Sequence, residues 1–359
     1  MGGQRVKVLF VLSNLNEGGA QKVSVTLLRF LDRTIFEPHL VVIGESGVFE
    51  KDIPKDVPIT FLRLKRVRQA HFPLLKEIYR IRPATVFATL GYVNLGVLML
   101  RPFLPKGTRV VVREGAIVSS ILNSSSVAPL WRTFYRRFYP RADQVICQSN
   151  FMRQDLKEAI GVTTANMTHI YNPVDVAAID ALSNEGENPF ISHGQGPHVV
   201  TVGRLAKIKN YDNLVLRFRD LVSEKPDAHL WLLGTGPEQS ALEELARAQG
   251  IASQVHFMGH QSNPYLWLKY ADLFVLCSKS EGLPNALLEA VACRCPVIST
   301  VHPGGTGEIF ANIGQSKRFV EALNWEPWWF ERPETETRAR LVSVHDLNRV
   351  VLQYQEVLR

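Results

Sequence analysis

The stretch LFVLCSKSEGLPNALLEAVACRCPVIST, residues 273–300, contains two continuous apolar runs with a helix-like segment between them. Apolar runs without alternation are typical of strands whose two faces are both covered. Pro284 suits the first turn of a helix, where a missing N–H group is harmless, so we expect a helix over residues 285–291. A strand, a helix and a second strand in this order predict a parallel βαβ unit.

This pattern recurs through the chain and indicates two sets of parallel strands. Continuous apolar runs followed by turn residues occur at 7–12, 39–43, 85–90, 109–113 and 144–149, and again at 198–203, 229–234, 255–259, 273–278 and 295–300. Between the two sets, residues 169–198 are rich in Asn, Gly, Pro and Ser, as linkers are. We therefore expect an α/β fold with two Rossmann-like, doubly wound domains.

Length and composition agree with this expectation. The chain has 359 residues, of which 46% are hydrophobic and 21% charged, which is typical of a globular protein with more than one core. The N-terminal apolar run is short and ends in polar residues, so we interpret it as a buried strand and not as a secretory signal. No apolar run is long enough to span a membrane. We expect buried thiols in a reducing compartment at Cys147, Cys277, Cys293 and Cys295.

The net charge of +7 favours an anionic partner. A nucleotide, a phospholipid surface and a nucleic acid all meet this condition. No DNA- or RNA-binding motif is present, and the basic residues are not gathered on one recognisable element, so we expect no nucleic-acid partner.

The loop after the first expected strand, SNLNEGGAQK at residues 13–22, opens a helix. Its Gly18 and Gly19 would let backbone N–H groups approach an anion at the helix N-terminus. The loop is neither a GxGxxG nor a GxxxxGK[ST] motif. Two glycines after a strand are common in α/β turns, so the anion site is one interpretation and an ordinary turn is the other.

Loops in the second half of the chain carry further residues suited to a nucleotide. In VGRLAKIKN, residues 202–210, Arg204 supplies a planar fork and Lys209 a point charge, a combination that suits a diphosphate. Either cation alone is equally typical of a solvated loop. Small residues at other expected strand ends would line a nucleotide-sized cleft, namely Gly234, Gly236 and Gly259.

Glu281 lies before the expected helix of the opening stretch, and Glu289 lies inside it. The N–H groups of residues 282–285 and the helix dipole favour phosphate oxygens between the two acids. Carboxylates accept hydrogen bonds from sugar hydroxyls, so the pair could hold two hydroxyl clusters. A solvated helix face is the plainer interpretation. An acid/base pair as in glycosidases fits poorly, because nothing else indicates a polysaccharide groove.

Together and in this order, these motifs resemble those of glycosyltransferase family 4, the retaining, nucleotide-sugar-dependent enzymes with the GT-B fold. The matching segments are GGAQK at 18–22, ADQVICQSNF at 142–151, IYNPVD at 170–175, VGRLAKIKN at 202–210, LLGTGPE at 232–238, VHFMGH at 255–260 and SEGLPNALLEA at 280–290. The last segment holds the EX7E motif, which begins at Glu281 and ends at Glu289. That spacing is common by chance, but its combination with GLPN, GRLxxxKN and NPVD is specific.

The resemblance implies a role for each matching residue. Arg204 and Lys209 match the basic pair that holds the donor diphosphate. Glu289 matches the residue that binds the ribose hydroxyls, and Glu281 the residue that faces the donor sugar. The implied catalytic residues are Arg204, Lys209 and Glu281; the further implied donor contacts are Gly18, Gly19, Gly203, Gly259, Gly282, Leu283 and Asn285.

The resemblance also implies the domain organisation. Residues 1–175 would form the acceptor-binding domain and residues 176–340 the nucleotide-sugar-binding domain, with the two facing a cleft. Residues 341–359 would form a C-terminal helix that crosses back to the first domain.

The implied chemistry needs no cofactor and is metal-independent. The cationic pair and the helix N-terminus would stabilise charge on the leaving diphosphate. The resemblance implies retention by front-side attack with the donor phosphate as proton acceptor, so we name no protein nucleophile. We expect a hexose or N-acetylhexosamine from a UDP-sugar, moved to a saccharide or lipid-linked acceptor in polysaccharide or lipopolysaccharide biosynthesis. A GDP- or ADP-sugar with a small-molecule acceptor is the alternative; a nucleotide-sugar epimerase or a phosphorylase fits less well.

Two regions depart from the family pattern. Residues 110–120 carry Arg113 and Glu114 where many relatives have a histidine. We expect these two residues on the acceptor side with Gln21 and Lys22, although Glu114 fits a simple loop acid equally well. Beyond the retained Glu308, the aromatic sequence NWEPWWFE replaces the usual turn, so the structure of residues 311–343 is not predicted.

PLWRTFYRRFYPRA, residues 129–142, combines aromatic and arginine residues at helical spacing. This composition fits a helix on an anionic membrane surface, and it fits an ordinary amphipathic helix with its aromatic residues in the core slightly better. Residues 64–72 add positive charge to the same half of the chain. We expect a cytoplasmic protein, with attachment to the inner face of the plasma membrane if the first interpretation holds.

Overall fold

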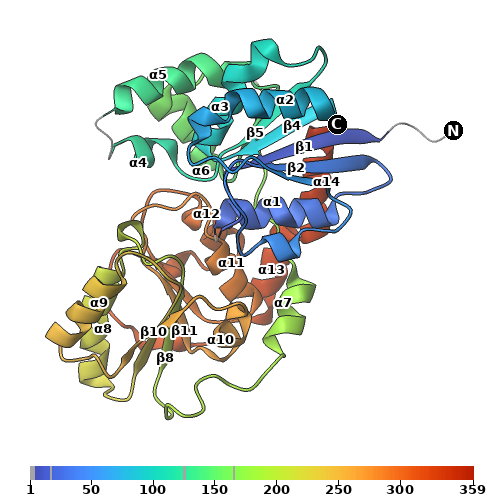
Figure 1. The fold of residues 1–359 in the computed structure, drawn as a ribbon. Coiled ribbons are helices and arrows are strands. Elements are labelled where there is room, and N and C mark those ends of the chain that lie inside the picture. Colours follow the sequence, from blue (N-terminus) through green and yellow to red (C-terminus); the bar gives the residue numbers. More distant parts are fainter. Residues whose placement is uncertain (1–4, 17, 124–126, 165) are drawn as a thin grey trace. The chain divides into compact units, whose positions relative to one another are not determined.

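The computed structural model describes residues 5–16, 18–123, 127–164 and 166–359. The chain forms two compact units (Figure 1). Unit 1 comprises Met1–Pro173 and Leu347–Arg359, and unit 2 comprises Val174–Asp346. The chain therefore leaves unit 1 after Pro173 and returns to it at Leu347, six residues later than the expected start of the final helix at 341.

Unit 1 contains a seven-stranded sheet in the order β3-β2-β1-β4-β5-β6-β7. All its strand pairs are parallel. The order reverses between β1 and β4, and open α/β sheets bind ligands beyond the carboxyl ends of the strands at such a point. The strands are β1 Val6–Leu12, β2 Phe36–Val42, β3 Ile59–Phe61, β4 Thr85–Thr89, β5 Arg109–Arg113, β6 Gln144–Cys147 and β7 Met167–His169.

Two helical layers cover this sheet, as Figure 1 shows. Helices α1 Gly19–Phe30 and α14 Leu347–Leu358 pack on one face. Helices α2 His71–Ile81, α3 Gly91–Leu100 and α5 Ala128–Phe138 pack on the other. The shorter helices of this unit are α4 Val118–Asn123 and α6 Asn150–Gln154, which continues as a π-helix over Asp155–Ile160.

Unit 2 contains a six-stranded parallel sheet in the order β10-β9-β8-β11-β12-β13. Its order reverses between β8 and β11. The strands are β8 His198–Val202, β9 His229–Leu233, β10 Val255–Gly259, β11 Leu273–Leu276, β12 Val297–Thr300 and β13 Phe319–Val320. The helices are α7 Val176–Ser183, α8 Tyr211–Glu224, α9 Gln239–Ala248, α10 Pro264–Tyr270, α11 Asn285–Ala292, α12 Thr306–Asn312 and α13 Thr335–His345.

The expected doubly wound α/β architecture is confirmed, and each of the ten expected strands is present within a few residues. Three strands were missed, β3, β7 and β13. They have two or three residues each, too few to show a periodic pattern. Pro284 occupies the N-cap of α11 and not its first turn.

The segment with no predicted structure, residues 311–343, completes the core of unit 2. Trp325 and Trp329 are buried there against α8 and the sheet. The buried Arg318 guanidinium donates hydrogen bonds to the carbonyl oxygens of Trp328, Trp329 and Glu331, which holds the aromatic segment against β12. The aromatic side chains therefore replace the usual turn by apolar packing.

Candidate functional site

The clearest cluster of charged residues in unit 2 lies where its sheet order reverses. Lys209 follows β8 and Glu281 follows β11, and these two strands are neighbours. Lys209 Nζ donates to Glu281 Oε1 at 2.6 Å. Both side chains are largely buried, so this charge-assisted bond is only weakly screened by water.

Glu281 is held by the loops around it. Ser278 Oγ donates to Glu281 Oε1 at 2.6 Å, and the Glu281 N–H donates to the Pro303 carbonyl at 3.2 Å. Gly305 N–H in turn donates to the Gly282 carbonyl at 3.0 Å. The loop after β11 is therefore fixed to the loop after β12, which orients the carboxylate toward Lys209.

Lys209 is positioned by the same set of loops. It ends a 3₁₀ turn, Lys207–Lys209, and Asn210 follows in the left-handed region with φ 58°. The Cys277 thiol donates to the Lys209 carbonyl at 3.1 Å, and the Lys279 N–H donates to the Ile208 carbonyl at 2.8 Å. Two loops that lie far apart in the sequence are thus held together at both sides of the ion pair.

Glycines end three adjacent strands beside this pair. A Cβ on Gly203 would lie 3.4 Å from Lys209 Cε and 2.9 Å from Tyr211 Oη. A Cβ on Gly234 would collide with the Gly203 carbonyl oxygen, and Gly234 N–H donates to the Gly259 carbonyl at 2.7 Å. Glycine at Gly203 and Gly234 thus lets neighbouring strand ends and the Lys209 loop pack closely against one another.

The other residues expected at the donor site lie on the same two loops or on α11. Arg204 is exposed and forms no ion pair with any residue that the structure describes. Gly282 and Leu283 are buried, Asn285 begins α11, and Glu289 is buried in its middle. Lys209 is bonded directly to Glu281. Within the described part of the chain, Arg204 forms no ion pair with Glu281 or with Glu289.

In unit 1, Gly18 caps α1 and Gly19 begins it. A Cβ on Gly18 would collide with the Gln21 amide oxygen, so the Gln21 side chain lies close over this turn. Gln21 is buried and donates from Nε2 to Asn14 Oδ1 at 3.2 Å. The Lys22 N–H donates to the Gly18 carbonyl at 3.0 Å.

Arg113 has a different place from the expected one. Its side chain is fully buried at the end of β5. It donates to Tyr354 Oη at 2.9 Å, to Asn172 Oδ1 at 2.6 Å and to Thr89 Oγ1 at 3.4 Å. We correct the expectation of a direct acceptor contact accordingly, because the guanidinium binds the returning helix α14 to the sheet.

Glu114 is also buried, next to Arg113. Its Oε1 accepts from Asn94 Nδ2 at 3.2 Å, and burial raises the pKa of the carboxyl to about 8 despite this bond and the nearby Arg113 charge. The carboxyl is therefore protonated at neutral pH. Glu114 lies in the loop after β5, as the plainer interpretation has it, but its carboxyl is buried there. An acceptor contact stays a prediction.

Helix α5 fits the interpretation as an ordinary amphipathic helix whose aromatic residues face the core. Tyr135 and Tyr139 are buried, and Trp131, Phe134 and Phe138 pack against the core of unit 1. Two of its arginines donate to backbone carbonyls of the neighbouring π-helix: Arg132 to Ala159 at 2.5 Å and Arg136 to Ile160 at 2.6 Å. Its aromatic residues therefore stabilise the fold by packing on the core of unit 1.

The four cysteines are free thiols, of which Cys147, Cys277 and Cys295 are buried and Cys293 is half-buried. Within the described residues, every helix is too short or too polar to cross a bilayer. The same part of the chain contains no group of three or more His, Cys, Asp or Glu side chains arranged to hold a metal ion.

Sequence reasoning missed several residues that shape the cluster. Ser278 is in the stretch quoted first, but only the fold shows that its hydroxyl binds Glu281. His302 is buried, and its Nδ1 contacts the Thr300 carbonyl at 2.7 Å while its Nε2 contacts Thr306 Oγ1 at 2.8 Å. These contacts hold the turn that accepts the Glu281 N–H. No local pattern would have identified either residue.

Two family descriptions match separate parts of this chain. Residues 17–178 match the description Glycosyltransferase Family 4, and residues 187–327 match Glycosyl transferases group 1. The first match falls almost entirely in unit 1 and the second in unit 2.

Two relatives match this chain over about four fifths of their own length. The chain is 30% identical over 315 residues to an uncharacterized glycosyltransferase of Haemophilus influenzae, which covers 82% of this chain and 80% of that protein. It is 29% identical over 317 residues to the N-acetylgalactosamine-N,N'-diacetylbacillosaminyl-diphospho-undecaprenol 4-alpha-N-acetylgalactosaminyltransferase of Campylobacter jejuni, with 85% and 83% covered.

Solved structures share the fold. The crystal structure of Anabaena Alr3699/HepE in complex with UDP and glucose aligns with a TM-score of 0.78 at 17% identity and covers 99% of each chain. A glycosyltransferase from Rickettsia africae aligns with a TM-score of 0.78 at 14% identity, with 99% of this chain and 98% of that chain covered. Two Rossmann-like domains of this kind constitute the GT-B fold.

Proposed function

The chain belongs to glycosyltransferase family 4, and we propose that it is a retaining enzyme that uses a UDP-sugar. The sugar would be a hexose or an N-acetylhexosamine. The acceptor would be a lipid-linked saccharide or a growing glycan in polysaccharide or lipopolysaccharide biosynthesis, and the enzyme would act at the cytoplasmic face of the plasma membrane.

The observation that carries the donor proposal is the Lys209–Glu281 pair at the reversal of the unit 2 sheet. A cation is held there beside strand ends that consist of glycine backbone. The pair suits a diphosphate, since a largely buried cation attracts phosphate oxygens strongly.

Residue roles follow from this geometry and from the family motif. Arg204 and Lys209 would bind the diphosphate, with Gly203 and Gly259 leaving room for it. Glu289 would bind the ribose hydroxyls from inside α11. Glu281 would accept hydrogen bonds from the donor sugar. The backbone of Gly282, Leu283 and Asn285 would complete the turn that contacts sugar and phosphate.

The reaction replaces the sugar–phosphate bond by a bond to the acceptor hydroxyl on the same face of the sugar. Negative charge grows on the departing UDP, and Lys209 and Arg204 would stabilise it electrostatically. The acceptor proton would pass to the departing phosphate oxygen, which needs no protein nucleophile and no metal ion. Gly18 and Gly19 would contact the donor, and Gln21 and Lys22 would serve the acceptor.

Similar proteins support UDP and a lipid-linked acceptor. The name of the Campylobacter relative specifies a diphospho-undecaprenol acceptor and transfer of N-acetylgalactosamine. The Anabaena structure contains UDP and glucose. A GDP- or ADP-sugar with a small-molecule acceptor is the second candidate.

Nucleotide binding tests the donor assignment. Since a ligand that binds only the native state raises its stability by mass action, UDP should raise the melting temperature more than GDP or ADP does. A larger shift with GDP or ADP would favour the second candidate, and no shift with any nucleotide would refute the donor site. A panel of UDP-sugars, with membrane-extract acceptors present or absent, then identifies the sugar through UDP release.

A further inference from the structure

Positive charge is concentrated in one segment of unit 1. Residues 62–109 contain ten Lys and Arg residues and one acid, Glu77, for a net charge of +9. The whole chain has +7, so the remaining residues together carry −2. The basic character of the protein therefore arises in this segment, which runs from the end of β3 through α2, β4 and α3 to the start of β5. This amends the expectation that no element gathers the basic residues.

The same segment carries three of the most exposed large apolar side chains. Phe72 is 78% exposed, Phe103 61% and Tyr79 52%. Phe72 and Tyr79 lie seven residues apart on α2, hence on one face, and Lys76 lies on that face between them. Tyr79 Oη donates to the Phe103 carbonyl at 3.1 Å, which brings the third aromatic residue beside the end of α2.

A cavity of about 350 Å³ adjoins this surface at the start of β5. Its lining includes Arg101, Lys106 and Arg109, with Asp143 as the only acid. Thr108 Oγ1 donates to the Pro83 carbonyl at 3.2 Å, which links the cavity to the end of α2. Cations and aromatic side chains thus form one continuous surface.

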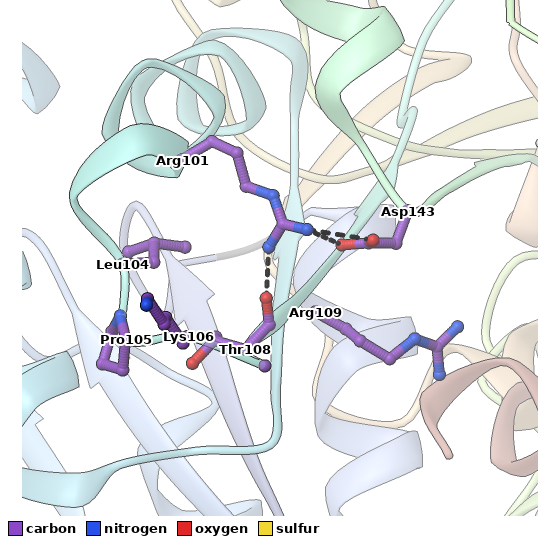
Figure 2. A pocket seen from close by; sticks show the side chains of 8 residues that line it. Arg101, Leu104, Pro105, Lys106, Thr108, Arg109 and Asp143 are labelled. Atoms are coloured by element: carbon purple, nitrogen blue, oxygen red, sulfur yellow. Dashed lines mark hydrogen bonds and ion pairs between the residues drawn. The ribbon is translucent and has the colours of Figure 1, made fainter.

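The single acid of the cavity is already neutralised. Figure 2 shows Arg101 between the Thr108 carbonyl and the Asp143 carboxylate, while Arg109 extends away from that pair. Asp143 also accepts from the Val110 N–H at 2.6 Å. Among the residues that the structure describes, Lys106 and Arg109 have no carboxylate partner, and the same holds for Lys76 and Arg82. These charges remain available to an external anion.

We propose that this basic-aromatic surface, made of α2, the turn Arg101–Phe103 and the cavity, docks on an anionic phospholipid bilayer. Phe72, Tyr79 and Phe103 enter the interfacial layer, where aromatic side chains are favoured. Lys76, Arg82, Lys106 and Arg109 bind headgroup phosphates, and the cavity accommodates one headgroup. This proposal deepens the membrane part of the proposed function but does not depend on the donor or on the acceptor.

Charge complementarity together with apolar exposure favours a bilayer over other polyanions. Proteins that bind single-stranded nucleic acid use a basic groove that follows the phosphates. Aromatic rings inside that groove stack on the bases. Here Phe72 and Tyr79 occupy the outer face of a helix, which suits insertion into a surface. Helix α5, which the sequence offered as one candidate for membrane contact, packs its aromatic residues on the core of unit 1.

Vesicle flotation with the full chain tests the proposal. One vesicle type contains phosphatidylcholine alone, and the other also contains phosphatidylglycerol. We expect binding to the anionic vesicles at low salt, little binding to the neutral ones, and release at high salt, since salt screens headgroup contacts.

Two variants test the position of the surface. Lys106→Ala with Arg109→Ala should lower binding about five-fold for each lost cation. Phe72→Ser with Phe103→Ser should lower it about ten-fold. Controls are Lys55→Ala, in a segment whose neighbours pack on the opposite face of the sheet, and Ile191→Ser, an exposed apolar residue of unit 2. All variants should retain the melting temperature, because they alter exposed positions or the cavity rim.

Three outcomes would overturn the proposal. The first is no binding to anionic vesicles at low salt, including the case in which only a DNA or RNA oligonucleotide binds. The second is equal binding to neutral vesicles. The third is binding that the surface variants and the control variants weaken equally. The thermal shift with UDP is independent of these results, so a failed donor site and a failed docking surface are distinguishable.

Discussion

Lys209 Nζ lies 2.6 Å from Glu281 Oε1, although 72 residues separate the two in sequence. The pair bridges the loops that follow β8 and β11, where the order of the unit 2 sheet reverses. A diphosphate would compete with Glu281 for the ammonium group of Lys209. We infer that donor binding loosens the pair and releases the carboxylate toward the sugar.

Glu281→Gln tests this competition. The neutral amide no longer attracts Lys209, so affinity for free UDP should stay equal or rise, while turnover of the UDP-sugar should fall about a hundred-fold. Lys209→Ala should weaken UDP binding about ten-fold or more. Calorimetry and steady-state kinetics measure the two quantities, with the exposed neighbour Lys279→Ala as the control. A parallel loss of UDP affinity in Glu281→Gln would contradict the competition.

Glu289→Ala should weaken UDP binding about ten-fold, because ribose hydroxyls would lose a charged acceptor. Binding of inorganic pyrophosphate should change little, since the diphosphate contacts remain. Glu244→Ala, an exposed acid on α9, serves as the control. Equal weakening of UDP and pyrophosphate would assign Glu289 to the phosphate or to folding, and the melting temperature of the free variant separates these two.

Gly234→Ala should destabilise the protein by more than about 2 kcal/mol and abolish the UDP-induced thermal shift. The added methyl group would meet the Gly203 carbonyl, at φ 143°. Gly250→Ala is the matched control, because its φ is also positive, at 72°, but nothing lies near its Cβ. Its expected loss is about 1 kcal/mol. Thermal unfolding measures both losses. If the two variants lose equal unfolding free energy, the contact with the Gly203 carbonyl does not contribute to the destabilisation.

The raised pKa of Glu114 predicts a pH-dependent stability. Its folded pKa of about 8 exceeds the ordinary value of 4.5 for a glutamate, so the folded state binds the proton more tightly than the unfolded state between these pH values. This contribution to stability is complete below about pH 4.5 and is lost as pH rises toward 8. Glu114→Gln should remove that dependence and should be more stable than the parent near neutral pH. Urea unfolding across this pH range measures the unfolding free energy of the parent and of the variant. If the two free energies change with pH in the same way, Glu114 is not the source of the pH dependence.

The lowered pKa of His256 predicts the opposite pH dependence of folding stability. Its ring stacks on Trp231 with centroids 4.0 Å apart, and its Nε2 lies 3.0 Å from His229 Nδ1. Burial, together with the charges of His229, His193 and His198, lowers the pKa of His256 to about 4. The unfolded state therefore binds the proton first, and stability is lost as pH falls from about 6.5 toward 4.

His256→Phe retains the stacking and removes the titrating group. Its unfolding free energy should decline less between about pH 7 and pH 5 than that of the parent. Chemical unfolding at both pH values measures the difference. The exposed His260 is the control position, and an equal decline in His256→Phe and His260→Phe would exclude the cluster as the cause.

Much of the fold was predictable because buried parallel strands leave a local signature. The apolar runs ending at Leu12, Leu233 and Leu276 are continuous and are followed by turns, and each became a strand. Strand β13 has two residues, Phe319 and Val320, and no signature of that length exists. Residues 341–359 were expected to form one helix, but α13 ends at His345 and α14 begins at Leu347. The apolar pattern of this segment gives no sign of the break at Asp346.

Side-chain environments were less predictable. Arg113 and Glu114 are polar residues after an apolar run, which is where a site residue also occurs. Only the packing of α14 shows that Tyr354 accepts from Arg113. The composition of α5 favoured a core position for its aromatic residues only slightly over a membrane surface, and their packing on the core of unit 1 is seen only in the structure.

The sequence by itself determined the two α/β sheets, the loops that follow their strands and the residue types available there, because these depend on interactions between near neighbours. Tertiary structure alone decided that Lys209 meets Glu281, that Arg113 is enclosed, and that Phe72, Tyr79 and Phe103 share one basic surface. Those relationships depend on the strand order and on which helix covers which face. Both are set by burial of apolar area over the whole domain, which no single segment encodes.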